Sequence, residues 1–189
     1  MKRRYELKQR AERQDRTRQR IVEATIELHA SKGPARTTLS DIARRAGVQR
    51  HTLYRHFPDA LSLGLACSGL YAERNPLPDP RPWLALAGEE RLRRGIGELY
   101  HYYERNEPML SRVTADTETH ALTRQMSELR FGEAMAAIHA ALATVLPRRK
   151  AARATLDLAL EFRTWQRLRR SGLSTRAAID TVVRALLVQ

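Results

Sequence analysis

Apolar residues recur three and four positions apart along almost the whole chain, and no run of useful length alternates with period two. That spacing places apolar side chains on one face of an α-helix, whereas a half-buried strand needs strict alternation. Glycine and proline, which interrupt helices, occur at few places between these stretches. The sequence therefore predicts an all-α fold with roughly nine helices, an N-terminal three-helix domain followed by a larger helical domain.

The expected helix ends follow from capping residues, glycine and proline. The first helix reaches from the basic N-terminus to about Ser31, and Asn106-Glu107-Pro108, Pro147 and Ser171-Gly172 are expected to end later helices. The remaining predicted helices span 38–47, 48–57, 59–73, 89–105, 108–118, 121–145, 149–171 and 174–188.

Composition excludes some classes of protein. The 42% hydrophobic fraction of the 189 residues can supply a core, so a fully disordered chain is excluded. The single cysteine, Cys67, cannot form an internal disulfide. No signal peptide is expected behind the charged N-terminus, and no apolar stretch reaches the ~20 residues of a bilayer span. We therefore expect a cytoplasmic protein without a membrane partner.

Positive charge is concentrated at the N-terminal end. The chain has 34 Lys+Arg against 21 Asp+Glu, a formal charge of +13, and all but four of the cations are Arg. Residues 1–20 hold nine cations against three anions, and residues 1–65 hold 15 against 7. Because a charge excess raises the local potential only where it is concentrated, the N-terminal third is suited to a polyanionic partner.

Two short helices joined by a glycine form the most informative motif. Thr38 and Asp41 have the spacing of a capping box, and Gly47 permits the left-handed conformation between the two helices. Pro58 closes the second helix. This pattern is typical of a helix-turn-helix, in which the second helix enters the DNA major groove. The alternative is an ordinary helical hairpin with a solvated face.

Residues 17–57 resemble the DNA-binding domain of tetracycline-repressor-like (TetR-type) transcriptional regulators. The resemblance is carried by Thr17-Arg18, Ile21, Val22, Ala24, Gly33, Thr38, Asp41-Ile42-Ala43, Ala46-Gly47-Val48 and Thr52-Leu53-Tyr54-Arg55-His56-Phe57. It implies a helix-turn-helix domain over 17–65 and a helical effector-binding and dimerisation domain over 66–189. The charge pattern places a basic arm over 1–16 before them, and the four prolines over 76–82 mark a break that we take as the linker between the N-terminal and C-terminal domains.

The resemblance also implies a function. It implies a sequence-specific, ligand-responsive repressor that binds a palindromic DNA operator as a homodimer and responds to an unknown small-molecule effector. In a bacterial cell such a protein lies on the nucleoid through its operator. A basic architectural protein that binds nucleic acid without sequence preference is the alternative.

Residues of the motif take their expected roles from this resemblance. Thr38 and the amide of Leu39 would hold a phosphate at a helix N-terminus, and Tyr54 and His56 would form a phosphate-contacting pair. Arg50 is the best candidate to bond a guanine. The residues expected to contact DNA are Thr38, Leu39, Ser40, Gln49, Arg50, His51, Thr52, Tyr54, Arg55, His56, Arg13, Arg16 and Arg20.

The sequence departs from the family at two of these places. Gln49 replaces a small capping residue, and Ala60 replaces a phosphate-binding lysine. The basic arm can compensate, because Arg13, Arg16 and Arg20 share one face of a helix. A frayed, solvated tail is the alternative for the arm.

The C-terminal part supplies candidates for an effector pocket and a dimer interface. The pocket candidates are Tyr100, Tyr103, Arg112, Val113, Asp116, Thr117, His120, Met126, Phe131, Phe162 and Trp165. Plain core is the alternative for the apolar members, and a surface ion-pair ladder is the alternative for Arg112, Asp116 and His120. The interface candidates, for a four-helix bundle, are Leu158, Leu160, Leu168, Ile179, Val182, Val183, Leu186 and Leu187. Burial within one subunit is the alternative for these.

An enzyme is not expected. The sequence has no Gly-x-Ser-x-Gly elbow, no phosphate-binding glycine loop and no His-Glu-x-x-His motif. His51 and His56 are five residues apart and do not share a helix face, so a helix-borne zinc pair fails on geometry. We expect neither a cofactor nor a metal.

Overall fold

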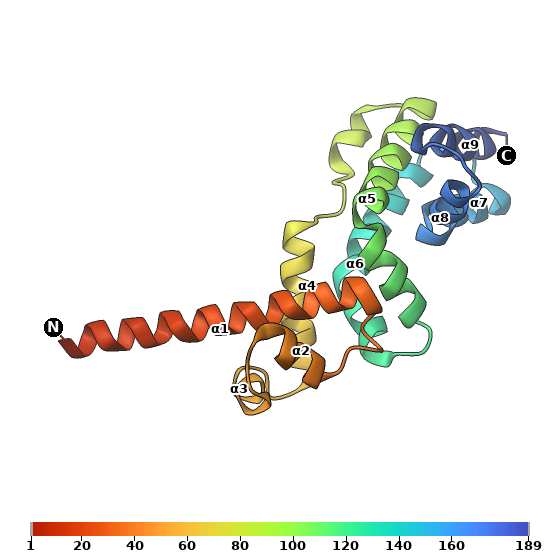
Figure 1. The fold of residues 1–189 in the computed structure, drawn as a ribbon. Coiled ribbons are helices and arrows are strands. Elements are labelled where there is room, and N and C mark those ends of the chain that lie inside the picture. The colour runs from red at the N-terminus through yellow and green to blue at the C-terminus, as the bar shows by residue number, and fades with distance from the viewer. Residues whose placement is uncertain (1, 189) are drawn as a thin grey trace. The chain divides into compact units, whose positions relative to one another are not determined.

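The computed structural model describes residues 2–188, with side chains at all of these positions except 2–4, 6 and 7. Met1 and Gln189, the end residues of the predicted arm and of the predicted C-terminal domain, lie outside the described residues. The described part holds nine α-helices, one 3-10 turn (η1) and no strand, which confirms the all-α prediction. The elements (Figure 1) are α1 (Lys2–Lys32), α2 (Leu39–Ala46), α3 (Arg50–His56), α4 (Ala60–Arg74), η1 (Arg81–Ala85), α5 (Gly88–Asp116), α6 (Ala121–Ala143), α7 (Lys150–Leu160), α8 (Phe162–Arg170) and α9 (Thr175–Leu187).

The chain divides into two compact units. Unit 1 extends to Asn75 and also contains Ser111–Ser127, and unit 2 contains Pro76–Leu110 and the chain from Glu128 onward. The division therefore differs from a boundary at residue 65. All of α4 and the turn between α5 and α6 belong with the helix-turn-helix. In the described residues no helix combines the length and the apolar character that a membrane span would need.

The core of unit 1 lies where α1, α2, α3 and α4 meet. It contains Ile21, Val22, Ala24, Ile42, Ala43, Ala46, Leu53, Phe57, Leu63 and Cys67. A bidentate ion pair adds a tie at the edge of this core, because Arg74 of α4 donates to both oxygens of Glu23 on α1 at 2.8 and 2.6 Å. The core gives the two short motif helices a fixed base that neither could provide alone.

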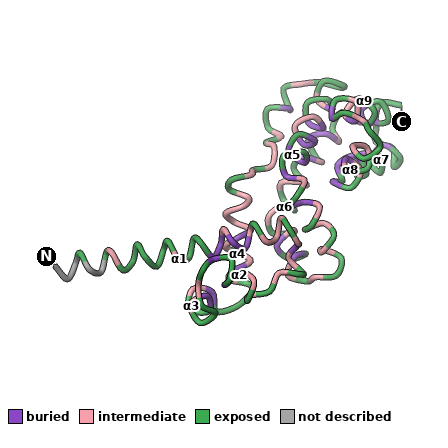
Figure 2. Tube along the Cα trace, viewed as in Figure 1, coloured by how far each residue is buried: buried purple, intermediate pink, exposed green. Residues whose placement is uncertain are grey.

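Helix α1 begins well before this core. It is continuous from Lys2, and the residues between Lys8 and Arg20 are exposed except for the half-buried Gln9 and Thr17 (Figure 2). At about 1.5 Å per residue, the segment before Ile21 extends roughly 28 Å past the first core residue. In Figure 1 this segment projects beyond α2, α3 and α4 as a single helix.

Helix α5 continues through Pro108, so the predicted helix end at 105 and restart at 108 are wrong. Proline removes one intrahelical hydrogen bond and crowds the preceding turn. Helix α5 is nevertheless buried on both sides of it, through Tyr102 and Tyr103 before the proline and Met109 and Leu110 after it. Tertiary packing thus outweighs the local preference of proline to end a helix.

The predicted helix 149–171 is also wrong, because the structure breaks it at Glu161 between α7 and α8. Glu161 has extended backbone angles, φ −70° and ψ 134°. Two buried tyrosines of α5 bond the carbonyls beside the break: the Tyr100 hydroxyl donates to Ala159 O at 3.0 Å and the Tyr103 hydroxyl to Leu160 O at 2.5 Å. These bonds satisfy carbonyls that the break would otherwise leave unpaired in the core of unit 2.

The Pro-rich stretch 76–82 leads directly into that core. Trp83 in η1 is 1% exposed, and its indole Nε1 donates to Glu98 at 3.1 Å. Gly95 of α5 lies against this ring, because a Cβ there would come within 3.0 Å of Trp83 and 2.6 Å of Leu142. The Pro-rich stretch is therefore the first segment of unit 2.

Candidate nucleic-acid interface

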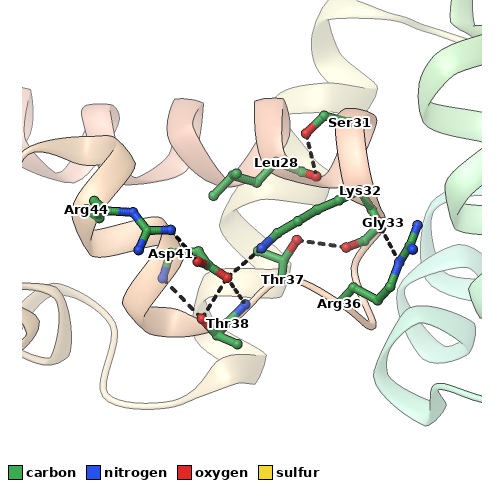
Figure 3. A network of polar contacts seen from close by, with 9 residues as sticks. All are labelled: Leu28, Ser31, Lys32, Gly33, Arg36, Thr37, Thr38, Asp41 and Arg44. Atoms are coloured by element: carbon green, nitrogen blue, oxygen red, sulfur yellow. Dashed lines mark hydrogen bonds and ion pairs between the residues drawn. The ribbon is translucent and has the colours of Figure 1, made fainter.

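The N-terminus of α2 is held by a compact set of polar contacts (Figure 3). The Asp41 amide donates to the Thr38 hydroxyl at 3.1 Å, and the Thr38 amide donates to Asp41 Oδ2 at 3.2 Å, which completes the predicted capping box. Lys32 at the end of α1 donates to the same carboxylate at 2.5 Å, and Arg44 donates to its other oxygen at 2.7 Å. The hydrogen bond from Lys32, followed by those from Thr38, lowers the pKa of Asp41 far below its usual value, so this carboxylate is charged at neutral pH.

The same contacts define which groups at this end are free. The Thr38 hydroxyl donates to Asp41 Oδ2 at 2.8 Å and is already in use. Within the described residues, the first two amides of α2, those of Leu39 and Ser40, have no hydrogen-bond acceptor. Unpaired amides at a helix N-terminus favour an anion. The free donors at this helix end are therefore the amides of Leu39 and Ser40 rather than the Thr38 side chain.

The turn between α2 and α3 has the geometry that glycine permits. Gly47 adopts φ 63° and ψ 42°, and the Val48 amide donates to Ala43 O at 3.0 Å. Ala43 and Ala46 are buried beneath the turn. A side chain with a Cβ would be strained at this φ, so the angle between the two helices depends on Gly47.

Helix α3 presents most of its predicted DNA-contacting residues to solvent. Gln49, Arg50, His51, Tyr54 and Arg55 are exposed. Ser40 on α2 is exposed and Thr52 is half-buried, whereas Leu53 and Phe57 of the same segment are 0% and 1% exposed. Gln49 occupies the N-cap of α3, but its side chain makes no capping hydrogen bond. The side-chain amide of Gln49 is therefore available to a ligand.

Arg50 and Tyr54 interact along the exposed face of α3. Arg50 Nη2 donates to the Tyr54 hydroxyl at 3.1 Å, and the guanidinium carbon lies 5.7 Å from the centre of the Tyr54 ring. A guanidinium carries five N–H donors, and this contact uses one nitrogen.

His56 faces inward more than Tyr54 does. Its Nε2 is buried and has no hydrogen-bond partner among the described residues. Burial, followed by the charges of Arg55 and Arg18, lowers the pKa of His56. The imidazole is therefore neutral at neutral pH, and a phosphate contact would use Nδ1. Arg18 lies over the neighbouring Phe57 ring at 4.8 Å, which joins α1 to the end of α3.

The three arm arginines, Arg13, Arg16 and Arg20, lie on α1 and are all exposed. The arm is helical in the structure, so these side chains share a face as their spacing requires. The sequence assigns no contact to Lys32 or to Arg18, whose partners lie on other helices. The one signal for Lys32 was its place at the end of α1, just before the capping box.

The predicted effector-pocket residues fall into two groups. Unit 2 brings Tyr103, Phe162 and Trp165 together with ring centres 5.4–6.1 Å apart, Tyr100 lies 6.1 Å from Tyr103, and Phe131 packs against the same core. The other predicted members, Arg112, Val113, Asp116, Thr117, His120 and Met126, belong to unit 1 with the helix-turn-helix.

Asp116 and His120 have partners of their own in unit 1. Asp116 accepts from the Ala35 amide at 2.8 Å, and His120 Nδ1 lies 2.7 Å from the Thr123 hydroxyl. These contacts differ from the surface ion-pair ladder considered for Arg112, Asp116 and His120.

The predicted interface residues also divide. Leu160, Val182, Val183 and Leu186 are buried within unit 2 itself, and Leu168 and Ile179 pack against its core. Leu158 and Leu187 are 58% and 45% exposed. Only this last pair is open to a second copy of the chain, together with Val188, which is 85% exposed.

Residues 21–63 match the sequence model of a family described as bacterial regulatory proteins of the tetR family. Over 47 residues the chain is 45% identical to two HTH-type transcriptional regulators from Pseudomonas putida, SrpR and TtgW. Each alignment covers 25% of this chain, and they cover 22% and 35% of those two proteins. The sequence similarity to these two regulators thus lies in the helix-turn-helix, and this chain spans about a quarter to a third of their length.

Solved structures extend the likeness of the fold. One assigned to a TetR-family transcriptional regulator from Rhodococcus sp. superposes with a TM-score of 0.62 at 19% identity, covering 91% of this chain and 97% of that one. The transcriptional regulator SCO7518 from Streptomyces coelicolor A3(2) superposes with a TM-score of 0.57 at 21% identity, covering 90% and 98%. These matches concern the fold alone. The matched family is one of regulators rather than enzymes, and residues 21–63 of this chain, which contain its helix-turn-helix, match the tetR family of bacterial regulatory proteins.

Proposed function

We propose that the protein is a sequence-specific DNA-binding transcriptional regulator whose α3 enters the major groove. The observation that carries this proposal is the contrast within one short helix. Leu53 is fully buried in a core shared with α1, α2 and α4, while Gln49, Arg50 and His51 are exposed. A rigid base lets polar side chains meet base edges in a fixed register.

The contacts divide into positioning and base recognition. The amides of Leu39 and Ser40 hold one phosphate, with the Thr38 cap fixing the helix end, and Tyr54, Arg55 and His56 approach the backbone from α3. Gln49, Arg50, His51 and Thr52 choose the sequence. Arg13, Arg16 and Arg20 supply sequence-independent affinity through the sugar-phosphate backbone or the minor groove.

A homodimer on a palindromic operator is the proposed assembly. The exposed Leu158, Leu187 and Val188 support it, because they add apolar surface near the end of the chain. Replacing Leu158 and Leu187 by Glu should convert a dimer into a monomer in analytical ultracentrifugation. An intact chain that sediments as a monomer at all concentrations would refute the dimer.

Effector control is proposed for unit 2, which makes the protein a ligand-responsive repressor. The aromatic cluster of Tyr100, Tyr103, Phe162 and Trp165 supports this assignment. The Trp165 indole is 1% exposed, and its Nε1 has no hydrogen-bond partner among the described residues. A ligand with a hydrogen-bond acceptor would satisfy that donor.

Selection of bound duplexes from a random pool tests the proposed function. The full-length chain should enrich a palindrome whose half-sites are centred about one helical turn apart or a multiple of it. Enrichment without any shared sequence would instead favour a basic architectural protein.

A further inference from the structure

A contact distant from α3 holds the loop that precedes α2. Asp116, the last residue of α5, accepts a hydrogen bond from the amide of Ala35 at 2.8 Å, across 81 residues of sequence. Ala35 lies in the short loop between α1 and α2. The Asp116 carboxylate therefore holds the loop that places Thr38 at the N-cap of α2.

Gly33 makes this approach possible. It has φ +92°, which favours glycine, and a Cβ at this position would lie 2.7 Å from Asp116 Oδ2. Any other residue would force the carboxylate or the loop to move. The glycine thus serves both the conformation of the loop and its contact with α5.

The residues of the loop move together because the loop is short and hydrogen-bonded within itself. Gly33 O accepts from the Thr37 hydroxyl at 2.7 Å, and Pro34 O accepts from the Thr37 amide at 3.1 Å. Arg36 Nε donates to Lys32 O at 2.9 Å (Figure 3). A shift at Ala35 therefore carries Thr37 and Thr38 with it, and with them the free amides of Leu39 and Ser40.

Asp116 occupies a place where local energetics disfavour it. An anion in the last turn of a helix opposes the helix dipole, and the last turn of α5 contains no basic residue. Replacing Asp116 should therefore leave the stability of α5 unchanged or increase it. A loss of DNA affinity on its replacement would come from the loop rather than from unfolding.

We propose that Asp116 is a positioning residue for DNA binding, which holds the α1–α2 loop so that the amides of Leu39 and Ser40 meet one phosphate. The inference rests on the proposed function. Asp116 and Ala35 both belong to unit 1, so the contact lies within the unit that carries the helix-turn-helix.

Two variants of the full-length chain test the proposal. Asp116→Ala removes the acceptor, and Asp116→Asn keeps an oxygen that can accept from Ala35. Asp116→Ala should bind random and selected duplexes alike about 3-fold to 10-fold more weakly, the range expected for one lost contact. Asp116→Asn should restore most of the affinity. Both variants should remain folded and melt within about 4 °C of the unmodified chain, because the lost hydrogen bond and the relieved repulsion with the helix dipole partly offset each other.

If only the loss of a negative charge mattered, Asp116→Ala would bind DNA more tightly, not more weakly. Glu133→Ala on the exposed part of α6 removes one carboxylate in the same way, and it should leave DNA binding equal or slightly tighter. Asp116→Ala matching this control, or Asp116→Asn losing as much affinity as Asp116→Ala, would overturn the proposal.

Phosphate ethylation interference on the selected duplex gives a pattern that a general loss of protein stability would not change. In the unmodified chain, one interfering phosphate in each half-site should belong to the α2 N-terminus. Asp116→Ala should lose interference at that phosphate and keep it at the others, and an unchanged pattern would contradict the proposal. Failure of the unmodified chain to enrich any sequence would instead refute the proposed function.

Discussion

The guanidinium of Arg50 lies along the exposed face of α3 and donates to the hydroxyl of Tyr54, one helical turn later, at 3.1 Å. The contact aligns a residue expected to read a base with one expected to hold a phosphate. It also restricts the rotamers of a long side chain before DNA arrives, which lowers the entropy lost on binding. Arg50 thus has a preferred direction from which its remaining donors can reach a base.

Arg50→Ala should cost ~1–3 kcal/mol of binding free energy on the selected duplex and relax preference at one base pair. The guanidinium fork can bond O6 and N7 of guanine together, and no other base offers that pair of acceptors in the major groove. Binding to every single-base variant of the selected duplex checks this. Equal losses on all variants would mean that Arg50 contacts only the backbone.

Tyr54→Phe should weaken binding to all duplexes by a similar factor, about 3-fold to 10-fold. The substitution removes a phosphate contact and frees Arg50 from its partner, while the ring, 40% exposed, stays in place. Titrations on selected and random duplexes measure the effect. A changed base preference with unchanged affinity for random DNA would assign Tyr54 to base recognition instead.

Replacing Arg13, Arg16 and Arg20 together by Ala should lower affinity for selected and random duplexes equally. If each of these arginines in both subunits of the proposed homodimer neutralises one phosphate, the slope of log K against log salt should become about 5.4 less steep. Replacing Arg105, Arg148 and Arg153, which are exposed in unit 2, makes the same charge change away from the arm. Identical slopes for the two triple variants would show that the arm does not contact DNA.

Stability should fall as pH drops from about 6.5 to about 4 because of His29. Burial lowers the pKa of His29 from 6.5 to about 4, and this effect exceeds the opposing attraction of Asp116. Across that window the unfolded chain binds a proton that the folded chain does not, so the loss should reach roughly 3 kcal/mol. Above pH 6.5 this group adds no pH dependence.

Urea unfolding at several pH values checks the effect of His29. The variant His29→Gln should flatten the curve between pH 4 and 6.5, whereas replacement of the exposed His51 should not. An unchanged curve for His29→Gln would place the pH dependence elsewhere.

Tyr103→Phe should destabilise the fold by about 1–3 kcal/mol, because it leaves the Leu160 carbonyl without its donor in the core. Chemical unfolding monitored by tryptophan fluorescence measures the loss of stability in unit 2. Tyr54→Phe removes an exposed hydroxyl and is the matched control, with an expected change below about 0.5 kcal/mol. Equal stabilities for the two variants would remove the hydroxyl as a stabilising contact at the helix break.

The helix-turn-helix could be predicted from sequence because its determinants are local. Thr38, Asp41 and Gly47 lie within ten residues of one another, and the structure confirms the capping box and the left-handed turn. The break at Glu161 depends on tyrosines nearly 60 residues away, and the passage of α5 through Pro108 depends on packing. Neither has a local signal, so both predictions were wrong.

The role of Asp116 could not be predicted for the same reason. Its spacing from Arg112 and His120 on one helix suggested a ligand or a surface ion-pair ladder. Its partner is instead the amide of Ala35, in a loop that the fold brings to it. Gly33, two residues before Ala35, is the one local sequence feature that accompanies this contact.

In the proposed function, Gln49 to Thr52 choose the sequence while the basic arm supplies affinity for any DNA. Salt titrations of the full-length chain against a selected duplex and a scrambled duplex of the same composition test this division of roles. We expect the affinity for both duplexes to fall steeply with salt, and the selected duplex to bind at least about 1,000-fold more tightly than the scrambled one at each salt concentration. Comparable affinity for the two duplexes at every salt concentration would contradict it.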